Sequence, residues 1–162
     1  MSQDTIQSLS LARLQSLEDD LRSSGLYMVA GGELEHMLLR NSGMPYKEKV
    51  DEQRVRAAFN AQQYYKETYE GKYEIVFGNS RKVTADRYAV AEVAQAMVHA
   101  RAQLPDALSR QGIPETSFLP VTTFSDSTCG SHHNISAADA NGNNLFCDKR
   151  TGMFSNLALA TA

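Results

Sequence analysis

Asp126-Ser-Thr-Cys-Gly-Ser-His-His-Asn-Ile-Ser136 is the stretch from which we interpret this sequence, together with the residues that follow it. In Asp139-Ala-Asn-Gly-Asn-Asn-Leu-Phe146 the dipeptide Asn141-Gly142 separates two extended runs. An Asn-Gly pair in that position is the strongest short-range signal for a tight β-turn. The pattern therefore predicts a strand that leads into a hairpin.

The strand predicted over residues 132–136 has side chains that alternate between its two faces. We expect Ile135 to face the core. The opposite face then carries an imidazole, an amide and a hydroxyl, from His132, Asn134 and Ser136. Such a row has the chemistry of a ligand-binding face, but a half-exposed strand that turns polar residues outward gives the same pattern.

Acidic residues upstream favour the ligand-binding interpretation. Residues 26–39 have the pattern of a long strand, and Glu33 and Glu35 share one of its faces with Val29, Gly31 and Met37. Two like charges on a half-buried face repel each other, and burial makes their ionisation costly. Either these carboxylates face bulk water or a cation lies between them.

A second hairpin is predicted from Tyr64 to Phe77, with its turn near Glu70-Gly71. Its arms carry Glu67 and Glu74, whose carboxylates could converge. The alternative is that both glutamates are ordinary cross-strand partners of the lysines at positions 66 and 72. The sequence alone does not separate these two interpretations.

Helices are expected over residues 4–24, from Asp51 to about residue 62, in a run that residues 83–87 open, and from residue 151 to 162. The third has a face of small residues suited to packing on a sheet, and we expect it to be structural, with Glu92 and His99 solvated. Pro105 is expected to lie beyond its main run. Residues 113–120 should be extended.

Composition limits the class of protein. A chain of 162 residues with 42% hydrophobic content is enough for one domain with a core, and its formal charge of −3 comes from well-mixed acidic and basic residues. There is no basic run to suggest nucleic acid, and no apolar run of about 20 residues to cross a membrane. Without a signal-like N-terminus we expect a cytoplasmic protein with reduced thiols at Cys129 and Cys147. A zinc site would need more ligands than these cysteines and the neighbouring histidines supply.

The pieces, taken in order, resemble the catalytic domain of glutamine synthetases. That family has Gly-x-Glu-x-Glu on a strand, a later glutamate before Gln-x-Glu-Ile, and Ala-Asp-Arg at the start of a helix. It continues with Thr-Phe-Met-Pro, a Gly-Ser-Gly-Met-His-x-His-x-Ser segment and Asp-x-x-Gly-x-Asn-Leu-Phe. The corresponding segments here are Gly31-Gly-Glu-Leu-Glu35, Glu67 with Lys72-Tyr-Glu-Ile75, Ala85-Asp-Arg87, Thr116-Ser-Phe-Leu-Pro120, Cys129-Gly-Ser-His-His-Asn-Ile-Ser136 and the Asn-Gly hairpin. The resemblance covers most of the chain.

The resemblance implies an α+β fold, an antiparallel sheet with helices packed on its outside. It implies an ATP-dependent carboxylate–amine ligase that joins glutamate to ammonia or a small amine through γ-glutamyl phosphate, with Mg²⁺ or Mn²⁺ as cofactor. Carboxylate oxygens are the ligands that such cations prefer. By resemblance one metal would be held by Glu35, Glu67 and Glu74, and the other by Glu33 and His132. Ser136 would contact the nucleotide, and Gly130 falls in the substrate-binding segment.

Several positions depart from the family pattern. Asn134 replaces the second histidine, Lys72 replaces a glutamine, Ser127-Thr128 replaces an Asn-Gly, and Val121 replaces a lysine. Against the family, residues 1–162 correspond to a partial catalytic domain without the small N-terminal domain or the arginine-bearing C-terminal half.

We therefore expect impaired or no activity from the chain alone. An incomplete sheet exposes an edge and an apolar face, which favours association, as in a homo-oligomer, or instability. The alternatives are a non-catalytic remnant or partner-binding subunit that keeps the fold and a metal site, and a different metal-dependent hydrolase.

Overall fold

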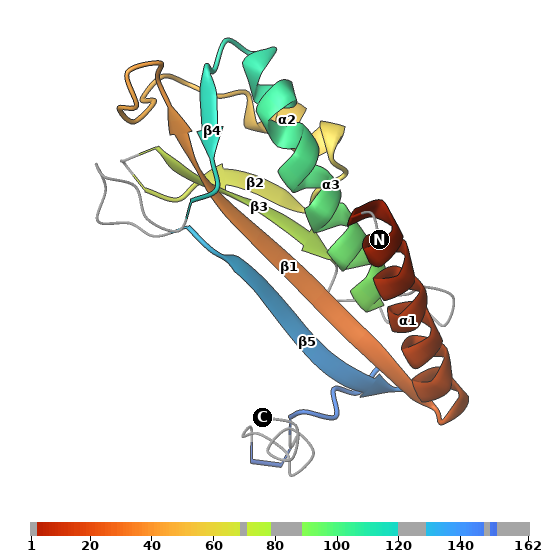
Figure 1. Ribbon diagram of the computed structural model, residues 1–162. Helices are drawn as coiled ribbons and strands as arrows, with labels where there is room; N and C mark the ends of the chain where they lie inside the picture. Colours follow the sequence, from red (N-terminus) through yellow and green to blue (C-terminus); the bar gives the residue numbers. More distant parts are fainter. Residues whose placement is uncertain (1–2, 69–70, 79–88, 120–128, 148–149, 152–162) are drawn as a thin grey trace. The chain divides into compact units, whose positions relative to one another are not determined.

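The computed structural model describes residues 3–68, 71–78, 89–119, 129–147 and 150–151. The elements are α1 (Gln3–Ser23), β1 (Leu26–Leu39), α2 (Glu52–Ala58), β2 (Gln63–Lys66), β3 (Lys72–Gly78), α3 (Ala89–Ser109), β4 (Glu115–Ser117) and β5 (Ser131–Asp139). The long strand β1 and the β2–β3 hairpin agree with the sequence prediction (Figure 1). The fold is α+β.

The strands form one sheet with the order β2-β3-β1-β4, and β5 also pairs with β1. β2 and β3 are antiparallel, with Tyr65 opposite Glu74. β1 and β4 are antiparallel as well, with Met37 opposite Ser117. The strand that carries Glu33 and Glu35 is therefore flanked by other strands, so its side chains project from the two faces of the sheet.

The chain divides into two compact units, each described by itself. The first consists of Met1–Gly31, Asn79–Val93 and Asn134–Ala162, and the second of Gly32–Gly78 and Ala94–His133. Both units take residues from β1, α3 and β5. The acidic residues singled out in the sequence all lie in the second unit.

In the second unit, one face of the sheet is an aromatic core around His36. The imidazole is fully buried, stacks on the rings of Tyr64 and Tyr73 with centroids 5.6 Å and 6.3 Å away, and lies 5.7 Å from the ring of Phe118. Leu34 and Leu38, two positions before and after, are also buried. Alternation along β1 thus places Leu34, His36 and Leu38 on one buried face.

In the first unit, α1 has the predicted helical span but an unexpected buried residue. Leu17 is exposed, whereas the side chain of Glu18 is buried. Its carboxylate accepts hydrogen bonds from the backbone N–H groups of Val90 (2.8 Å) and Ala91 (2.9 Å), in the first turn of α3. The first N–H groups of a helix lack intrahelical acceptors, so the Glu18 carboxylate serves as a cap from another element.

The helix predicted to run from Asp51 to residue 62 is shorter than expected. Asp51 is its N-cap and accepts a hydrogen bond from the Arg54 N–H at 3.0 Å, but α2 ends at Ala58. Asn60 adopts a positive φ of 49°, which ends the helix, and the Gln62 N–H bonds to the carbonyl of Val76. The residues after Ala58 therefore lead into β2.

The position predicted for Pro105 is also wrong, because Pro105 lies inside α3. A proline in a helix interior removes a hydrogen bond and crowds the preceding turn. Leu104 and Leu108 on either side of it are fully buried. We attribute the continuation of the helix past the proline to the burial of these two leucines. Glu92 and His99 are exposed, as expected.

The turn after β5 forms as predicted, with Gly142 at φ 78°. The Asp139 side chain accepts hydrogen bonds from the N–H groups of Asn141 and Asn143, and the returning segment pairs with β5 through an isolated bridge between Ala138 and Asn144. The orientation expected for Ile135 is wrong: this residue is 45% exposed, and the buried residues of the strand are Ala137 and Ala138. The small alanines, not the large aliphatic residue, are the buried side chains there.

Three predicted segments lie outside the described residues: Ala85-Asp-Arg87, the residues around 120–128 that include Val121 and Ser127-Thr128, and the helix expected after residue 151. No helix among the described residues is long and apolar enough to span a membrane.

Candidate metal centre

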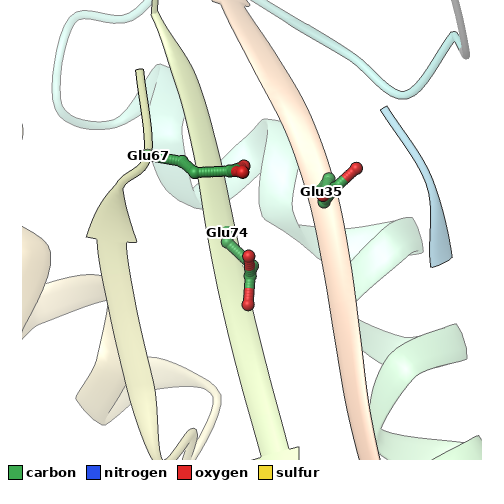
Figure 2. A group of neighbouring side chains, drawn as sticks. All are labelled: Glu35, Glu67 and Glu74. Carbon is green, nitrogen blue, oxygen red and sulfur yellow. The ribbon is translucent and has the colours of Figure 1, made fainter. Parts of the chain in front are cut away.

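Three glutamates from separate places in the chain meet on the sheet face opposite the aromatic core. Glu35 lies on β1, Glu74 on β3, and Glu67 directly follows β2. Each offers one carboxylate oxygen, and these oxygens all lie within 4.8 Å of one another. Figure 2 shows the three side chains together on one side of the strands. We call these three residues the acidic cluster.

The strand register explains why the cluster forms. Tyr65 on β2 pairs with Glu74 on β3, and Glu67 follows two positions later on the same side as Tyr65. The Glu67 N–H donates to the carbonyl of Lys72 at 2.9 Å, which extends the pairing by one step beyond β2. Glu67 is thereby turned to the face that carries Glu74.

The ammonium group of Lys72 lies inside the acidic cluster. Its Nζ is 2.9 Å from Glu35 Oε1 and 3.0 Å from Glu67 Oε2, and the side chain is only 8% exposed. Burial acts to lower the pKa of Lys72, but its hydrogen bonds to Glu35 and Glu67 outweigh this and raise the pKa above its ordinary value. Lys72 is therefore a cation at neutral pH.

Glu74 experiences a different balance. Burial raises the pKa of its carboxyl, a hydrogen bond from Tyr65 lowers it, and the nearby negative charges of Glu33, Glu67 and Glu35 raise it again, for a net increase. The same contact, after burial, raises the pKa of the Tyr65 phenol to about 12. The cluster is thus short of positive charge around Glu74.

Backbone contacts hold Glu35 in place. The Gly130 N–H donates to Glu35 Oε2 at 2.7 Å, and the Glu35 N–H donates to the Gly130 carbonyl at 3.0 Å. A Cβ atom at position 130 would lie 3.1 Å from His132 Nε2 and 3.5 Å from Glu35 Oε2. A side chain there would crowd the imidazole of His132 and would make an ordinary contact with Glu35.

Glu33 and His132 form a second, more exposed pair beside the cluster. His132 Nδ1 lies 3.4 Å from Glu33 Oε2, a long contact, and the side chains are 58% and 32% exposed respectively. The two residues come from β5 and β1. A carboxylate and an imidazole at this separation are a donor pair that a small movement could close around a cation.

Comparison with solved structures identifies the fold. A crystal structure of a novel glutamine synthase homologue superposes with a TM-score of 0.61 and 22% identity, covering 91% of this chain and 36% of that one. Two structures of GmaS, one an ADP complex and one without ligand, give TM-scores of 0.60 at 20% and 19% identity. This chain has a partial glutamine synthetase fold. Neither protein-family profiles nor curated protein sequences give a match.

The glutamine synthetase fold is called partial because this chain is shorter than its structural neighbours. The chain is covered to 91–93% by these neighbours but spans only 36–39% of their lengths. The fold class and the resemblance inferred from the motifs are confirmed.

Within this partial glutamine synthetase fold, the predicted metal residues lie in one region of the second unit. Glu35, Glu67 and Glu74 are together, and Glu33 and His132 are in contact. Gly130 is adjacent to Glu35, whereas Ser136 lies in the part of β5 that belongs to the first unit. Among the described residues the acidic cluster is the single group of three or more potential metal ligands. Cys129 and Cys147 are both free thiols, with Cys129 buried and Cys147 exposed.

Two residues of the site were not assigned a site role from the sequence. Lys72 departs from the family pattern and pairs with Glu67, as one alternative for the hairpin expected, while the carboxylates converge, as the other expected. The pairing expected for Lys66 is not seen, because Lys66 lies opposite Tyr73. The sequence pattern gave Tyr65 no role. The register of the β2–β3 hairpin could have indicated Tyr65. Lys72 and Glu74 are two residues apart on β3, and Tyr65 lies opposite Glu74.

Proposed function

We propose that this chain provides a metal- and substrate-binding part of an ATP-dependent carboxylate–amine ligase of glutamine synthetase type. The substrates would be ATP, glutamate, and ammonia or a small amine. One observation carries the proposal: three carboxylates converge on one sheet face in a fold that superposes on glutamine synthetase homologues. A neighbour solved as an ADP complex supports the nucleotide chemistry.

The donor set fits a hard divalent cation such as Mg²⁺ or Mn²⁺. The cluster has three carboxylates against one ammonium group, and burial together with neighbouring negative charge raises the pKa of Glu74. Glu35, Glu67 and Glu74 would hold one cation, and Glu33 with His132 the other. When bound, such ions neutralise phosphate oxygens. Gly130 positions Glu35, and a contact of Ser136 with the nucleotide stays a prediction.

Complete turnover is expected to need more than this region. The chain spans less than two-fifths of its structural neighbours' lengths, and a phosphoryl-transfer site needs cationic groups to clamp the phosphates. Among the described residues, the acidic cluster and the Glu33–His132 pair supply mainly negative charge and one lysine. We therefore expect the isolated chain to bind metal more readily than it catalyses the reaction.

A second candidate is a non-catalytic or partner-binding protein that keeps the fold. The observation that favours it is Lys72, which bonds two of the three carboxylates in place of an external cation. In that case the lysine would stabilise the sheet and ligase activity would be absent.

Metal binding tests the donor set that the ligase proposal needs. Mn²⁺ is titrated into the chain and into Glu35→Gln, with free Mn²⁺ followed by electron paramagnetic resonance. The matched control is Glu115→Gln, an exposed carboxylate on β4. The ligase proposal expects saturable binding that Glu35→Gln weakens by about tenfold or more and Glu115→Gln leaves unchanged.

Phosphate release from ATP tests the reaction itself. We expect any release to depend on glutamate and on an amine together, and to be lost in Glu35→Gln. If the chain is folded, as judged by circular dichroism, yet shows neither saturable Mn²⁺ binding nor substrate-dependent phosphate release, the ligase proposal is wrong and the second candidate stands.

A further inference from the structure

The position of Lys72 bears directly on the metal affinity of the acidic cluster. Its Nζ bonds Glu35 Oε1 and Glu67 Oε2 at 2.9 Å and 3.0 Å. The other oxygen of Glu35, Oε2, already accepts the Gly130 N–H at 2.7 Å. Both oxygens of Glu35 are therefore engaged by groups of the chain itself.

A divalent cation at the acidic cluster shares two of its three carboxylates with the ammonium group of Lys72. Cation–oxygen distances for Mg²⁺ and Ca²⁺ are about 2.0–2.6 Å, so an ion bound to Glu35 Oε1 and Glu67 Oε2 would lie very close to the present position of Nζ. Two cations that close repel strongly, and this repulsion is weakly screened because the lysine side chain is only 8% exposed. The ammonium and the metal ion cannot occupy the cluster together.

We propose that Lys72 is an internal counter-ion that competes with the divalent cation for the acidic cluster. This inference rests on the proposed metal-binding function and adds a regulatory element to it. Metal binding then requires the Lys72 side chain to leave Glu35 and Glu67, and the affinity of the chain for metal is lowered by the cost of that displacement. A neutral residue at position 72 frees the two carboxylates and gives a tighter site.

Lys72 is suited to this role by its strand position. It precedes Glu74 by two residues on β3, so its side chain projects from the same face as the cluster. Its flexible four-carbon stem can move the ammonium group without any change in the backbone. Displacement therefore leaves the sheet and the carboxylates in place.

The test compares Lys72→Gln with the parent chain by Mn²⁺ titration, again with free Mn²⁺ followed by electron paramagnetic resonance. The matched control is Lys66→Gln on β2, which removes the same charge from a side chain that points to the opposite face from Tyr65. Competition predicts that Lys72→Gln binds Mn²⁺ about tenfold tighter or more, while Lys66→Gln binds like the parent.

Each outcome decides something. Equal or weaker Mn²⁺ binding by Lys72→Gln, with saturable binding by the parent, overturns the competition while the proposed metal site stands. Absence of binding in all three proteins overturns both.

Removal of Lys72 leaves its carboxylates without a counter-ion, so the variant could unfold in metal-free buffer. Circular dichroism then gives the answer: refolding on addition of Mn²⁺ supports the competition, and failure to refold contradicts it.

Discussion

Glu35 and His36 are consecutive residues on β1, both buried and both ionisable, but their side chains lie in opposite surroundings. Glu35 lies on the acidic face with Lys72 and the Gly130 N–H as partners. His36 lies on the aromatic face, where Nε2 is 3.0 Å from the Tyr64 hydroxyl and rings stack on the imidazole. Burial lowers the pKa of His36 to about 3, so this side chain is neutral at physiological pH.

On β1, a residue of the candidate metal site and a residue of the aromatic core are therefore direct neighbours in the chain. A buried charge is tolerated where charged partners and N–H donors surround it, and in the competition proposed above the internal cation Lys72 gives way to an external one. A buried neutral ring contributes through packing and excludes both water and ions. The alternation of β1 therefore places the candidate metal site on one face and the aromatic core around His36 on the other.

The largest expected effect comes from a cavity on the aromatic face. Leu38 is fully buried, and Leu38→Ala should lower the free energy of unfolding by about 2–5 kcal/mol, measured by urea denaturation. Leu119→Ala, at a position that is 64% exposed, is the control and should change it by less than about 0.5 kcal/mol.

Substitutions on the aromatic face and on the acidic face should differ in their effect on Mn²⁺ binding. At a temperature where Leu38→Ala remains folded, its Mn²⁺ affinity should match that of the parent, whereas Glu35→Gln should lose affinity. If Leu38→Ala weakens Mn²⁺ binding as strongly as Glu35→Gln does, the two faces are not independent and the comparison fails.

Acid should destabilise the protein through the aromatic face. The unfolded chain takes up a proton on His36 near its ordinary pKa of 6.5, while the folded protein resists protonation down to about pH 3. Between these pH values the unfolded state binds more protons than the folded state. The stability that depends on a neutral His36 is therefore fully present above pH 6.5 and is lost as the pH falls toward 3. The slope from this group is about 1.4 kcal/mol per pH unit, or roughly 3 kcal/mol at pH 4.5.

Carboxylates titrate in the same range, so the prediction is read from a difference between variants. His36→Phe combined with Tyr64→Phe removes the imidazole together with its hydroxyl partner, and its stability should depend less steeply on pH than that of the parent. His99→Gln, which changes an exposed histidine, should keep the steep dependence. Equal slopes for the double variant and the parent would show that His36 is not held neutral.

Much of this arrangement could be predicted from the sequence because β-strands alternate. The pattern of residues 26–39 predicted β1 with its two faces, and the Glu-Gly turn predicted the hairpin that brings Glu67 and Glu74 together. These are local signals, since neighbours along a strand determine which side chains share a face.

Other features depend on contacts distant in sequence and were missed or misjudged. Glu18 caps α3 from 72 residues away, and Pro105 is accommodated inside a helix by buried leucines. Ile135 is exposed although its pattern predicted burial, because what covers a strand face is decided by other elements. Residue propensities and hydrophobic periodicity describe each segment by itself, and contacts with other elements can override both.

The smallest expected effect tests the hydrogen bond between Tyr65 and Glu74 on the acidic face. Tyr65→Phe removes the donor that favours the charged carboxylate, so the pKa of Glu74 should rise further and stability at neutral pH should fall by about 0.5–1.5 kcal/mol. The carboxyl carbon of Glu74 in an NMR pH titration reports the first change, and urea denaturation the second. Tyr27→Phe, on the part of β1 in the first unit, is the control and should leave Glu74 unchanged. If the pKa of Glu74 stays the same in Tyr65→Phe, the phenol does not contribute to the charge balance of the cluster, and Lys72 is left as its internal counterpart to the three carboxylates.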